Sequence, residues 1–440
     1  MRPAGLRTIE ITASNNAGAH TPKTTTASSS ARYKLIYRQI RTFCIFATTV
    51  LVLGCDSDVP QINSGRSVNI FDAQWWSPMV TVLVERLQLG PGERVFAVGR
   101  PGLHEELPAL FAAAVEAAGG IYVGTLSAQG PYGQDGDVTF VERARGADRG
   151  ELRELLRDVS VGIMLPGPTP ADPPYAAMQD LLWEQLGQHR TVHFHWAGAY
   201  TVEDRSYPIG STAGAVPTDG VREASLYRRA ILEQDFSELR SRHDAFEQAA
   251  RAGEIHVTTA AGTDIRFRIG ERPINRQDGD VSGARAAAGA ILIDREIEFP
   301  AGAVRVAPIE TSVHGVVVFP RSTWSGETVD DLRFVFAEGI MISLTADTNL
   351  GAVEAELAEE GARSFREFGL GFNTLLAVPT EDPWLPYFGY GAGVVRLSLG
   401  DNSEIGGNVE GNYVRWNFFL DASVSINGET WVEDGRLVRF

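Results

Sequence analysis

The hydrophobic pattern of this chain changes its period near residue 253, and that change limits the possible folds more than any other feature. Between residues 75 and 250, short apolar strands alternate with segments of helical period, as in parallel βαβ units. Beyond this point, strands in which apolar and polar residues alternate follow one another, with Gly, Asp and Asn at the turns. This pattern indicates an antiparallel sheet or barrel. We therefore predict an α/β domain with a parallel sheet at 75–250 and a β-rich (α+β) domain at 251–440. The length of 440 residues also exceeds what one hydrophobic core usually supports.

Individual elements follow from the same patterns. One continuous helix is predicted over 223–252, where charged residues lie on one side and apolar residues on the other, and it would connect the two domains. A second helix over 353–368 would interrupt the strands of the β-rich domain, with Glu367 near its end. No dinucleotide site is predicted, because no Gly-x-Gly-x-x-Gly motif follows the first strand. The strands predicted for the α/β domain cover 94–98, 121–126, 161–165 and 191–196, and its helices cover 105–118, 150–159 and 176–186.

The N-terminal region has the pattern of an export signal. Two arginines precede an uncharged run of 13 residues, 42–54, that ends directly before Cys55. This run is too short to span a bilayer comfortably and has the length of a signal-peptide core, while a buried core strand is the alternative interpretation. Residues 52–55 resemble a bacterial lipoprotein lipobox, in which the cysteine thiol accepts a diacylglycerol. We therefore expect a leader at 1–54, a tether at 55–74, and a membrane lipoprotein of the bacterial cell envelope on its periplasmic or extracytoplasmic side.

Charge and cysteine content exclude several classes of function. Residues 1–54 carry seven Lys or Arg and one acidic residue, so the remainder of a chain of net charge −17 carries −23. A body this acidic argues against a nucleic-acid partner, because binding phosphates needs a basic surface. Both cysteines, Cys44 and Cys55, precede the predicted domains, so we expect neither a disulfide framework nor a cysteine-ligated zinc site.

Two glutamates are candidates for a catalytic or metal site. Glu310 follows a strand-like run, and Glu367 comes directly before a glycine-rich segment at 369–371. Paired carboxylates from separate segments are suited to a divalent metal or to general-base chemistry. Each glutamate taken alone more often closes a helix or pairs with a surface arginine.

Five segments of the β-rich region carry a resemblance to a known family. Read in order, they resemble the successive signature segments of the aminopeptidase T family of metallo-aminopeptidases, and the resemblance extends from about residue 76 to the C-terminus. It implies an α/β domain, a β-rich domain that holds a dinuclear metal site, and homodimers that enclose a cavity. The segments are 253–273, 299–318, 365–373, 397–407 and 424–438.

The resemblance also implies which positions would hold the metals. The family's two metal-binding glutamates fall on Glu310 and Glu367. Its first ligand histidine falls on Arg396, however, and its His-x-Asp pair falls on Arg415 and Asn417. A guanidinium stays protonated and has no lone pair for a metal, so the resemblance implies a decayed site without a cofactor.

Binding without peptidase turnover is the function that these substitutions favour. Two arginines would restore the positive charge of a metal ion. They would either pair with the two glutamates or bind an anionic group such as a peptide carboxylate. The family's catalytic tyrosine falls on Ser403. The residues expected to bind a peptide or another small anionic ligand are Arg396, Arg415, Asn417 and Ser403.

Two other functions are compatible with the sequence. His314 lies four residues after Glu310 and would, with Glu367 and Asp401, complete a remodelled mononuclear site for zinc, cobalt or manganese. The protein would then be an active metal-dependent aminopeptidase or a related hydrolase. A hydrogen-bonded histidine in a turn is the alternative interpretation of His314. The third function is structural, in an envelope assembly formed through the dimer interface.

Overall fold

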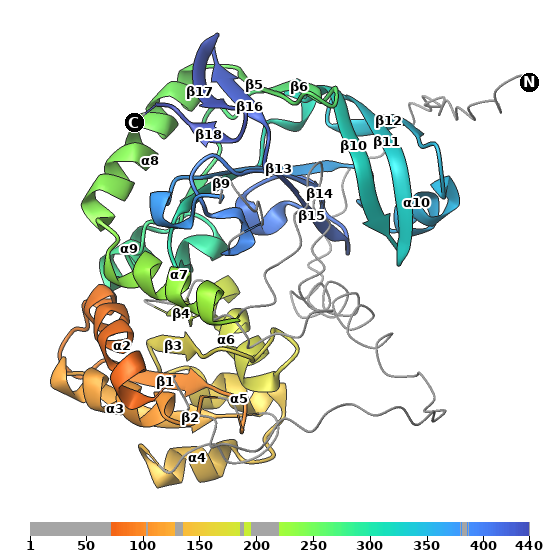
Figure 1. The fold of residues 1–440 in the computed structure, drawn as a ribbon. Helices are drawn as coiled ribbons and strands as arrows, with labels where there is room; N and C mark the ends of the chain where they lie inside the picture. Colours follow the sequence, from red (N-terminus) through yellow and green to blue (C-terminus); the bar gives the residue numbers. More distant parts are fainter. Residues whose placement is uncertain are drawn as a thin grey trace, which may run out of the picture.

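The chain folds into an α/β part and a β-rich part, drawn in orange to yellow and in green to blue in Figure 1. The computed structural model describes residues 72–102, 104–127, 135–184, 189–194, 220–378, 380, 385 and 387–439. The predicted leader, Cys55 and most of the predicted tether lie outside the described residues. Within the described ranges, no helix is both long and apolar enough to cross a membrane.

Sheet A of the α/β part has five parallel strands in the order β2-β1-β3-β4-β8. The predicted α/β class is therefore confirmed. The fifth strand, β8 (Glu296–Phe299), comes from beyond residue 251 and pairs with β4. The other strands are β1 (Arg94–Val98), β2 (Ile121–Leu126), β3 (Val161–Met164) and β4 (Arg190–Phe194). The helices of this part are α2 (Ala73–Leu87), α3 (Leu107–Ala117), α4 (Val138–Ala144), α5 (Arg149–Leu156) and α6 (Pro173–Glu184).

Sheet A is covered on both faces, so its strands are apolar at successive positions. Val95 and Ala97 of β1 pack in one buried cluster, together with Trp76 of α2. Phe96 and Val98 point the other way and pack in a second cluster. Burial of both faces is the usual condition of a parallel sheet, and it explains why these strands lack a polar face in the sequence.

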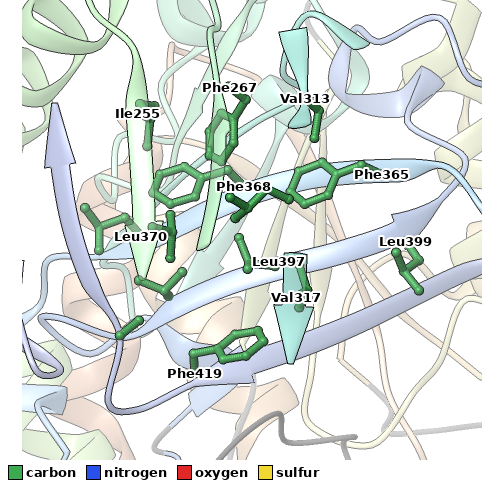
Figure 2. Close-up of a cluster of buried hydrophobic side chains, with 14 of the residues drawn as sticks. Ile255, Phe267, Val313, Val317, Phe365, Phe368, Leu370, Leu397, Leu399 and Phe419 are labelled. Atoms are coloured by element: carbon green, nitrogen blue, oxygen red, sulfur yellow. The ribbon is translucent and has the colours of Figure 1, made fainter. Parts of the chain in front are cut away.

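The β-rich part contains two antiparallel sheets, B and C, whose apolar side chains share one hydrophobic core (Figure 2). Phe368 and Leu370 of sheet B meet Ile255 and Phe267 of sheet C in this core. Sheet B has the order β15 (Val414–Phe419), β14 (Val395–Gly400), β13 (Phe365–Gly371), β9 (Ala303–Val306) and β7 (Ile274–Arg276). Sheet C has the order β12 (Ile340–Thr345), β11 (Glu327–Ala337), β10 (His314–Trp324), β6 (Asp264–Phe267), β5 (Ile255–Thr258), β16 (Ser423–Ile426), β17 (Glu429–Glu433) and β18 (Arg436–Leu437).

The prediction of one continuous connecting helix is wrong. The segment forms two helices, α7 (Gly220–Leu232) and α8 (Phe236–Ala252). Asp235 separates them, because its extended backbone and its side chain cap the N-terminus of α8 by accepting from the N–H groups of Ser237 and Glu238. Helix α8 packs its apolar face on the core of sheets B and C.

The predicted helix over 353–368 is also wrong. Helix α10 covers only Leu350–Glu356, and the chain then turns and enters strand β13. Glu367 therefore lies within a strand, between β14 and β9, and not at the end of a helix. The helix period of the segment was misleading because Phe365 and Phe368 gain more from packing between two sheets than from a local helix.

Candidate functional site

The centre of sheet B holds a fully buried carboxylate, Glu367, surrounded by three arginines. Arg305 of β9 donates to both oxygens, with Nε to Oε1 at 3.2 Å and Nη2 to Oε2 at 3.1 Å. Arg366 donates from Nε to Oε2 at 3.3 Å. Nη2 of Arg396 lies 2.5 Å from Oε1, which is an ion-pair distance, although its N–H groups do not meet hydrogen-bond geometry there. We call these three arginines the arginine cluster.

The register of sheet B brings this cluster together. Gly369 lies opposite Arg305 on one side and Arg396 on the other, so both guanidiniums lie on the face that also carries Glu367. A bulge between Phe365 and Glu367 adds one residue to β13. Arg366 can therefore reach the carboxylate of Glu367, the next residue in the chain. Arg396 packs over Gly369, where a Cβ atom would come within 3.2 Å of Nε. A side chain at this position would therefore require Arg396 to shift.

Electrostatics keep Glu367 ionised. Burial by itself would raise the pKa of this carboxyl, but the charges of Arg305, Arg396 and Arg366 outweigh burial and hold the pKa well below its ordinary value. Burial lowers the pKa of Arg396, and Glu367 offsets only part of that effect. Desolvation of so many charges is costly, and it is offset only because the ions lie close together.

Acidic side chains line the edge of the arginine cluster. Glu404 of the short helix η6 (Ser403–Ile405) accepts from Nη2 of Arg366 and lies 3.8 Å from Nη2 of Arg305. Glu296 of β8 accepts from Nε2 of Gln179 at 2.8 Å. Burial raises the pKa of Glu296 to about 8, against the hydrogen bond from Gln179, and the charges of Glu404 and Glu298 raise it further. Strand β8 thus brings acids of sheet A to the arginines of sheet B.

Glu310 has a separate set of partners. It begins the short helix η3 (Glu310–Ser312) and is bound by Arg272. Its Oε1 accepts from the backbone N–H of Asn408 at 2.8 Å. Burial opposes ionisation of Glu310, but the N–H of Asn408 and the charge of Arg272 outweigh it and lower the pKa. Asn402 connects the two glutamate sites, since its Nδ2 lies 3.4 Å from Oε1 of Glu310 and 3.3 Å from the carbonyl oxygen of Arg366.

Arg415 and Asn417 lie on the opposite face of sheet B from Arg396. Asn417 pairs in register with Leu397, which follows Arg396, and successive residues of a strand point to opposite faces. Nη1 of Arg415 lies 2.5 Å from Oε1 of Glu356, and its guanidinium lies 3.4 Å from the centre of the Trp324 ring. The expected pairing of an arginine with Glu367 is therefore found for Arg396, whereas Arg415 pairs with Glu356.

Ser403 and His314 occupy turns. The hydroxyl of Ser403 donates to Oδ1 of Asp401 at 2.7 Å, and its backbone N–H donates to the same oxygen at 2.8 Å. His314 is exposed at the start of β10. Its Nε2 lies 3.2 Å from the carbonyl oxygen of Thr311, and its Nδ1 accepts from the backbone N–H of Glu338 at 3.4 Å.

The side chains around Glu367 do not fit a divalent metal as they are arranged. The carboxylate is already shared by three guanidiniums, which have no lone pair to donate and would repel a second cation. Among the described residues, no group of three or more His, Cys, Asp or Glu side chains has an arrangement that could hold a metal ion. We therefore derive no chemical step through a metal at this position.

Sequence reasoning missed several residues of this site. Arg305 could have been found from the sequence, because it is the one charged residue in the otherwise apolar strand Ala303–Val306. A buried arginine needs an acidic partner. Arg366 was adjacent to the candidate Glu367, but nothing local indicated the bulge that places both on one face. Glu296 and Glu404 had no signal, since strand β8 joins the site only through sheet A.

Comparison with known proteins shows a resemblance to one family over part of the chain. The model of the family described as thermophilic metalloprotease (M29) matches residues 232–376, which include Glu310 and Glu367. The match ends before Arg396, Ser403 and the strand that carries Arg415. No curated protein gave a significant match.

Two solved structures share the fold over most of the chain. Wild-type AmpT from Thermus thermophilus matches with a TM-score of 0.52 and 13% identity, covering 83% of this chain and 100% of that one. A 2,5-dihydroxypyridine dioxygenase from Pseudomonas putida KT2440 matches with a TM-score of 0.52 and 12% identity, covering 83% and 97%. One fold therefore carries proteins of different names, and the fold alone does not decide the reaction. The predicted resemblance is confirmed, because residues 232–376 match the thermophilic metalloprotease (M29) family and the chain has a fold like that of AmpT.

Proposed function

We propose that this protein is an aminopeptidase T-like protein whose dinuclear metal site has decayed, and that it binds a peptide or another small anionic ligand without hydrolysing it. The observation that carries the proposal is the fully buried Glu367 with Arg305, Arg366 and Arg396 around it. Positive charge that a metal would supply is supplied here by side chains. A metal would have to displace guanidiniums that are themselves buried, which would leave uncompensated charges in the protein.

Unpaired donors in the same region support an anionic ligand. Arg396 and Ser398 lie two positions apart on β14, so they are on the same face of the strand, and both are buried. Within the part of the chain that the structure describes, Nε of Arg396 and the hydroxyl of Ser398 have no hydrogen-bond partner, nor has Nη1 of Arg366. Each buried polar group left unpaired costs about 1–3 kcal/mol. The oxygens of a carboxylate would satisfy these donors and recover that cost.

Metal analysis together with a hydrolysis assay tests the loss of turnover. The purified protein, incubated with zinc, cobalt or manganese and then dialysed, is expected to retain less than stoichiometric metal and to leave aminoacyl nitroanilides intact. Stoichiometric metal with hydrolysis that is lost in His314→Ala and in Glu310→Gln would overturn the proposal. That result would establish instead the active aminopeptidase built on Glu310, His314 and Glu367. His314 is exposed, so its replacement is not expected to prevent folding.

The proposed location and assembly need tests of their own. We propose that Cys55 carries a lipid that anchors the protein to the bacterial envelope, and that the protein forms a homodimer. Expression of Cys55→Ala should release the protein from the membrane fraction, and an unchanged distribution would refute the anchor. Light scattering on the protein from residue 56 onward should give twice the mass of one chain, whereas the mass of a single chain would refute the dimer.

A further inference from the structure

Strand β8 is the last strand of sheet A, and a side chain binds the edge that faces away from β4. Nε2 of Gln277 donates to the carbonyl oxygen of Glu296 at 3.0 Å, and its Oε1 accepts from the backbone N–H of Glu298 at 2.8 Å. In a parallel ladder, one residue of a neighbouring strand would bind these two backbone groups. The amide of Gln277 therefore takes the place of a further strand on sheet A.

The backbone of Gln277 belongs to sheet B. Its N–H donates to the carbonyl oxygen of Ala303 at 2.8 Å, and its carbonyl oxygen accepts from the N–H of Gly302 at 2.7 Å, which continues the pairing of β7 with β9. Nε2 also donates to Oδ1 of Asn275 at 3.0 Å, so every polar atom of Gln277 is bound. One buried residue thus carries hydrogen bonds to strands of both sheets.

The residues that follow Gln277 contact the α/β part. We call residues 277–281 the strap. Nε of Arg86, in α2, donates to the carbonyl oxygen of Gly279 at 2.7 Å. The backbone N–H of Val281 donates to the carbonyl oxygen of Arg86 at 3.2 Å. Helix α2 therefore holds the strap at two points.

The last residue of the strap is also held by strand β4. Nε of Arg190 donates to the carbonyl oxygen of Val281 at 2.7 Å. The other two nitrogens of this guanidinium bind the two oxygens of Glu93 at 2.8 and 2.9 Å, so the arginine is fixed in place. The side chain of Val281 packs in the apolar cluster that contains Trp76 of α2. The strap thus runs from sheet B to the core of the α/β part.

Two parts of one chain usually move relative to each other unless a strong interface holds them. We propose that the strap joins sheets A and B into one rigid unit, so that the α/β part and the β-rich part neither open nor unfold separately. Separation would break the hydrogen bonds of Gln277, Arg86 and Arg190 together and leave buried polar groups unpaired. This inference does not depend on the proposed ligand.

Hydrogen exchange measured by mass spectrometry in increasing urea tests the proposal on the parent protein. Peptides from β3 of sheet A and from β13 of sheet B should lose protection at the same urea concentration, because the two sheets open together. Loss of protection in β3 at a lower urea concentration than in β13 would overturn the proposal, since the α/β part would then open by itself.

The variant Gln277→Met keeps an unbranched side chain of similar length and removes its amide. In this variant β3 should exchange at least about tenfold faster than in the parent protein, and β13 should change less. Strand β3 is separated from β8 by β4, so a purely local loss at β8 would not change its exchange. Unchanged exchange of β3, or equal acceleration of β3 and β13, would overturn the proposal, because the sheets would stay joined without the amide.

Two further variants complete the experiment. Gln248→Met makes the same replacement at an exposed position on α8 and should leave the exchange of both strands unchanged. Arg86→Met removes the hydrogen bond to Gly279 but keeps an apolar stem against Phe236, and it should accelerate β3 more than β13. Equal exchange of the two strands in Arg86→Met would count against the strap even if Gln277→Met failed to fold. Circular dichroism verifies that each variant is folded.

Discussion

Arg305 and Glu367 form a two-point ion pair across strands β9 and β13, with donor–acceptor distances of 3.2 and 3.1 Å, and both side chains are buried. Arg305 lies opposite Gly369, two residues beyond Glu367 on the same face, so the pair is diagonal across the ladder. A buried pair of this kind contributes little relative to apolar residues but is very costly to break from one side. The cluster is therefore a place where single substitutions should have large effects.

Neutralising Glu367 should destabilise the protein strongly. Glu367→Gln leaves three arginines without their shared buried counterion, and a loss of about 3–5 kcal/mol in the free energy of unfolding is expected. Urea unfolding followed by tryptophan fluorescence measures this loss. The exposed Glu433→Gln should stay within about 0.5 kcal/mol of the parent protein. A loss below about 1 kcal/mol in Glu367→Gln would mean that the arginines do not depend on it.

The two arginines singled out in the sequence should behave differently. Arg396→Ala removes donors on the face with Glu367 and should weaken peptide binding at least about tenfold, since a hydrogen bond to a charged group contributes about 1.5–3 kcal/mol. Arg415→Ala breaks contacts with Glu356 and Trp324 on the other face, so it should lower stability and leave affinity within about twofold. Equal loss of affinity in both variants would contradict the assignment of faces.

Gly369 should not tolerate a methyl group. In Gly369→Ala the new Cβ would lie 3.2 Å from Nε and 3.3 Å from Cβ of Arg396, and the guanidinium would have to move. A cost of about 1–3 kcal/mol is expected, as for other overpacked sites. The control is Gly351→Ala in helix α10, where nothing lies within 4 Å of the added atom and alanine favours the helix. Equal effects in the two variants would rule out a steric role of Arg396.

The sequence predicted the two-part architecture because period and turn residues are local properties. Strands β1 to β4 of sheet A and the change to antiparallel pairing could be predicted in this way, whereas strand β8 could not. Helix 353–368 was mispredicted because the segment has both a helical period and aromatic residues that suit a strand, and tertiary pairing decided between them.

The candidate site was only partly accessible from the sequence. Glu367 and Arg396 were named, and the structure brings them together. The opposite orientation of Arg415 follows from the register of β14 with β15, which no local pattern gives. The contribution of Glu296 depends on a strand that returns to sheet A after the chain has entered the β-rich part. Such contacts join positions far apart in the chain, and local sequence patterns do not reveal them.

Glu296 should make the protein less stable as the pH rises. Its pKa is about 8 in the folded state and near 4.5 in the unfolded state, so between these values the folded protein holds a proton that the unfolded chain has lost. The free energy of unfolding then falls with pH by up to about 1.4 kcal/mol per unit. Urea unfolding at pH 6.5, 7.0, 7.5 and 8.0 should show this decline, and Glu296→Gln should flatten it. A decline of equal slope in the variant would assign it to other groups.

His243 should act in the opposite direction at lower pH. It is fully buried against Phe372, and burial lowers its pKa to about 3, with the nearby charge of Arg276 adding to the effect. Between pH 6.5 and 3 the unfolded chain binds a proton at this residue that the folded protein excludes, so stability falls as the pH decreases, by up to about 1.4 kcal/mol per unit.

Because Glu296 contributes the opposite slope above pH 4.5, the effect of His243 is best measured in Glu296→Gln. Unfolding of that variant between pH 6.5 and 5.0 should show the loss of stability before most carboxylates titrate. Adding His243→Leu, which keeps an apolar side chain against Phe372, should remove the slope. The partly exposed His256, paired with Asp264, provides the control: the variant His256→Gln should retain the slope. A slope that persists without His243 would show that a different group takes up the proton on unfolding.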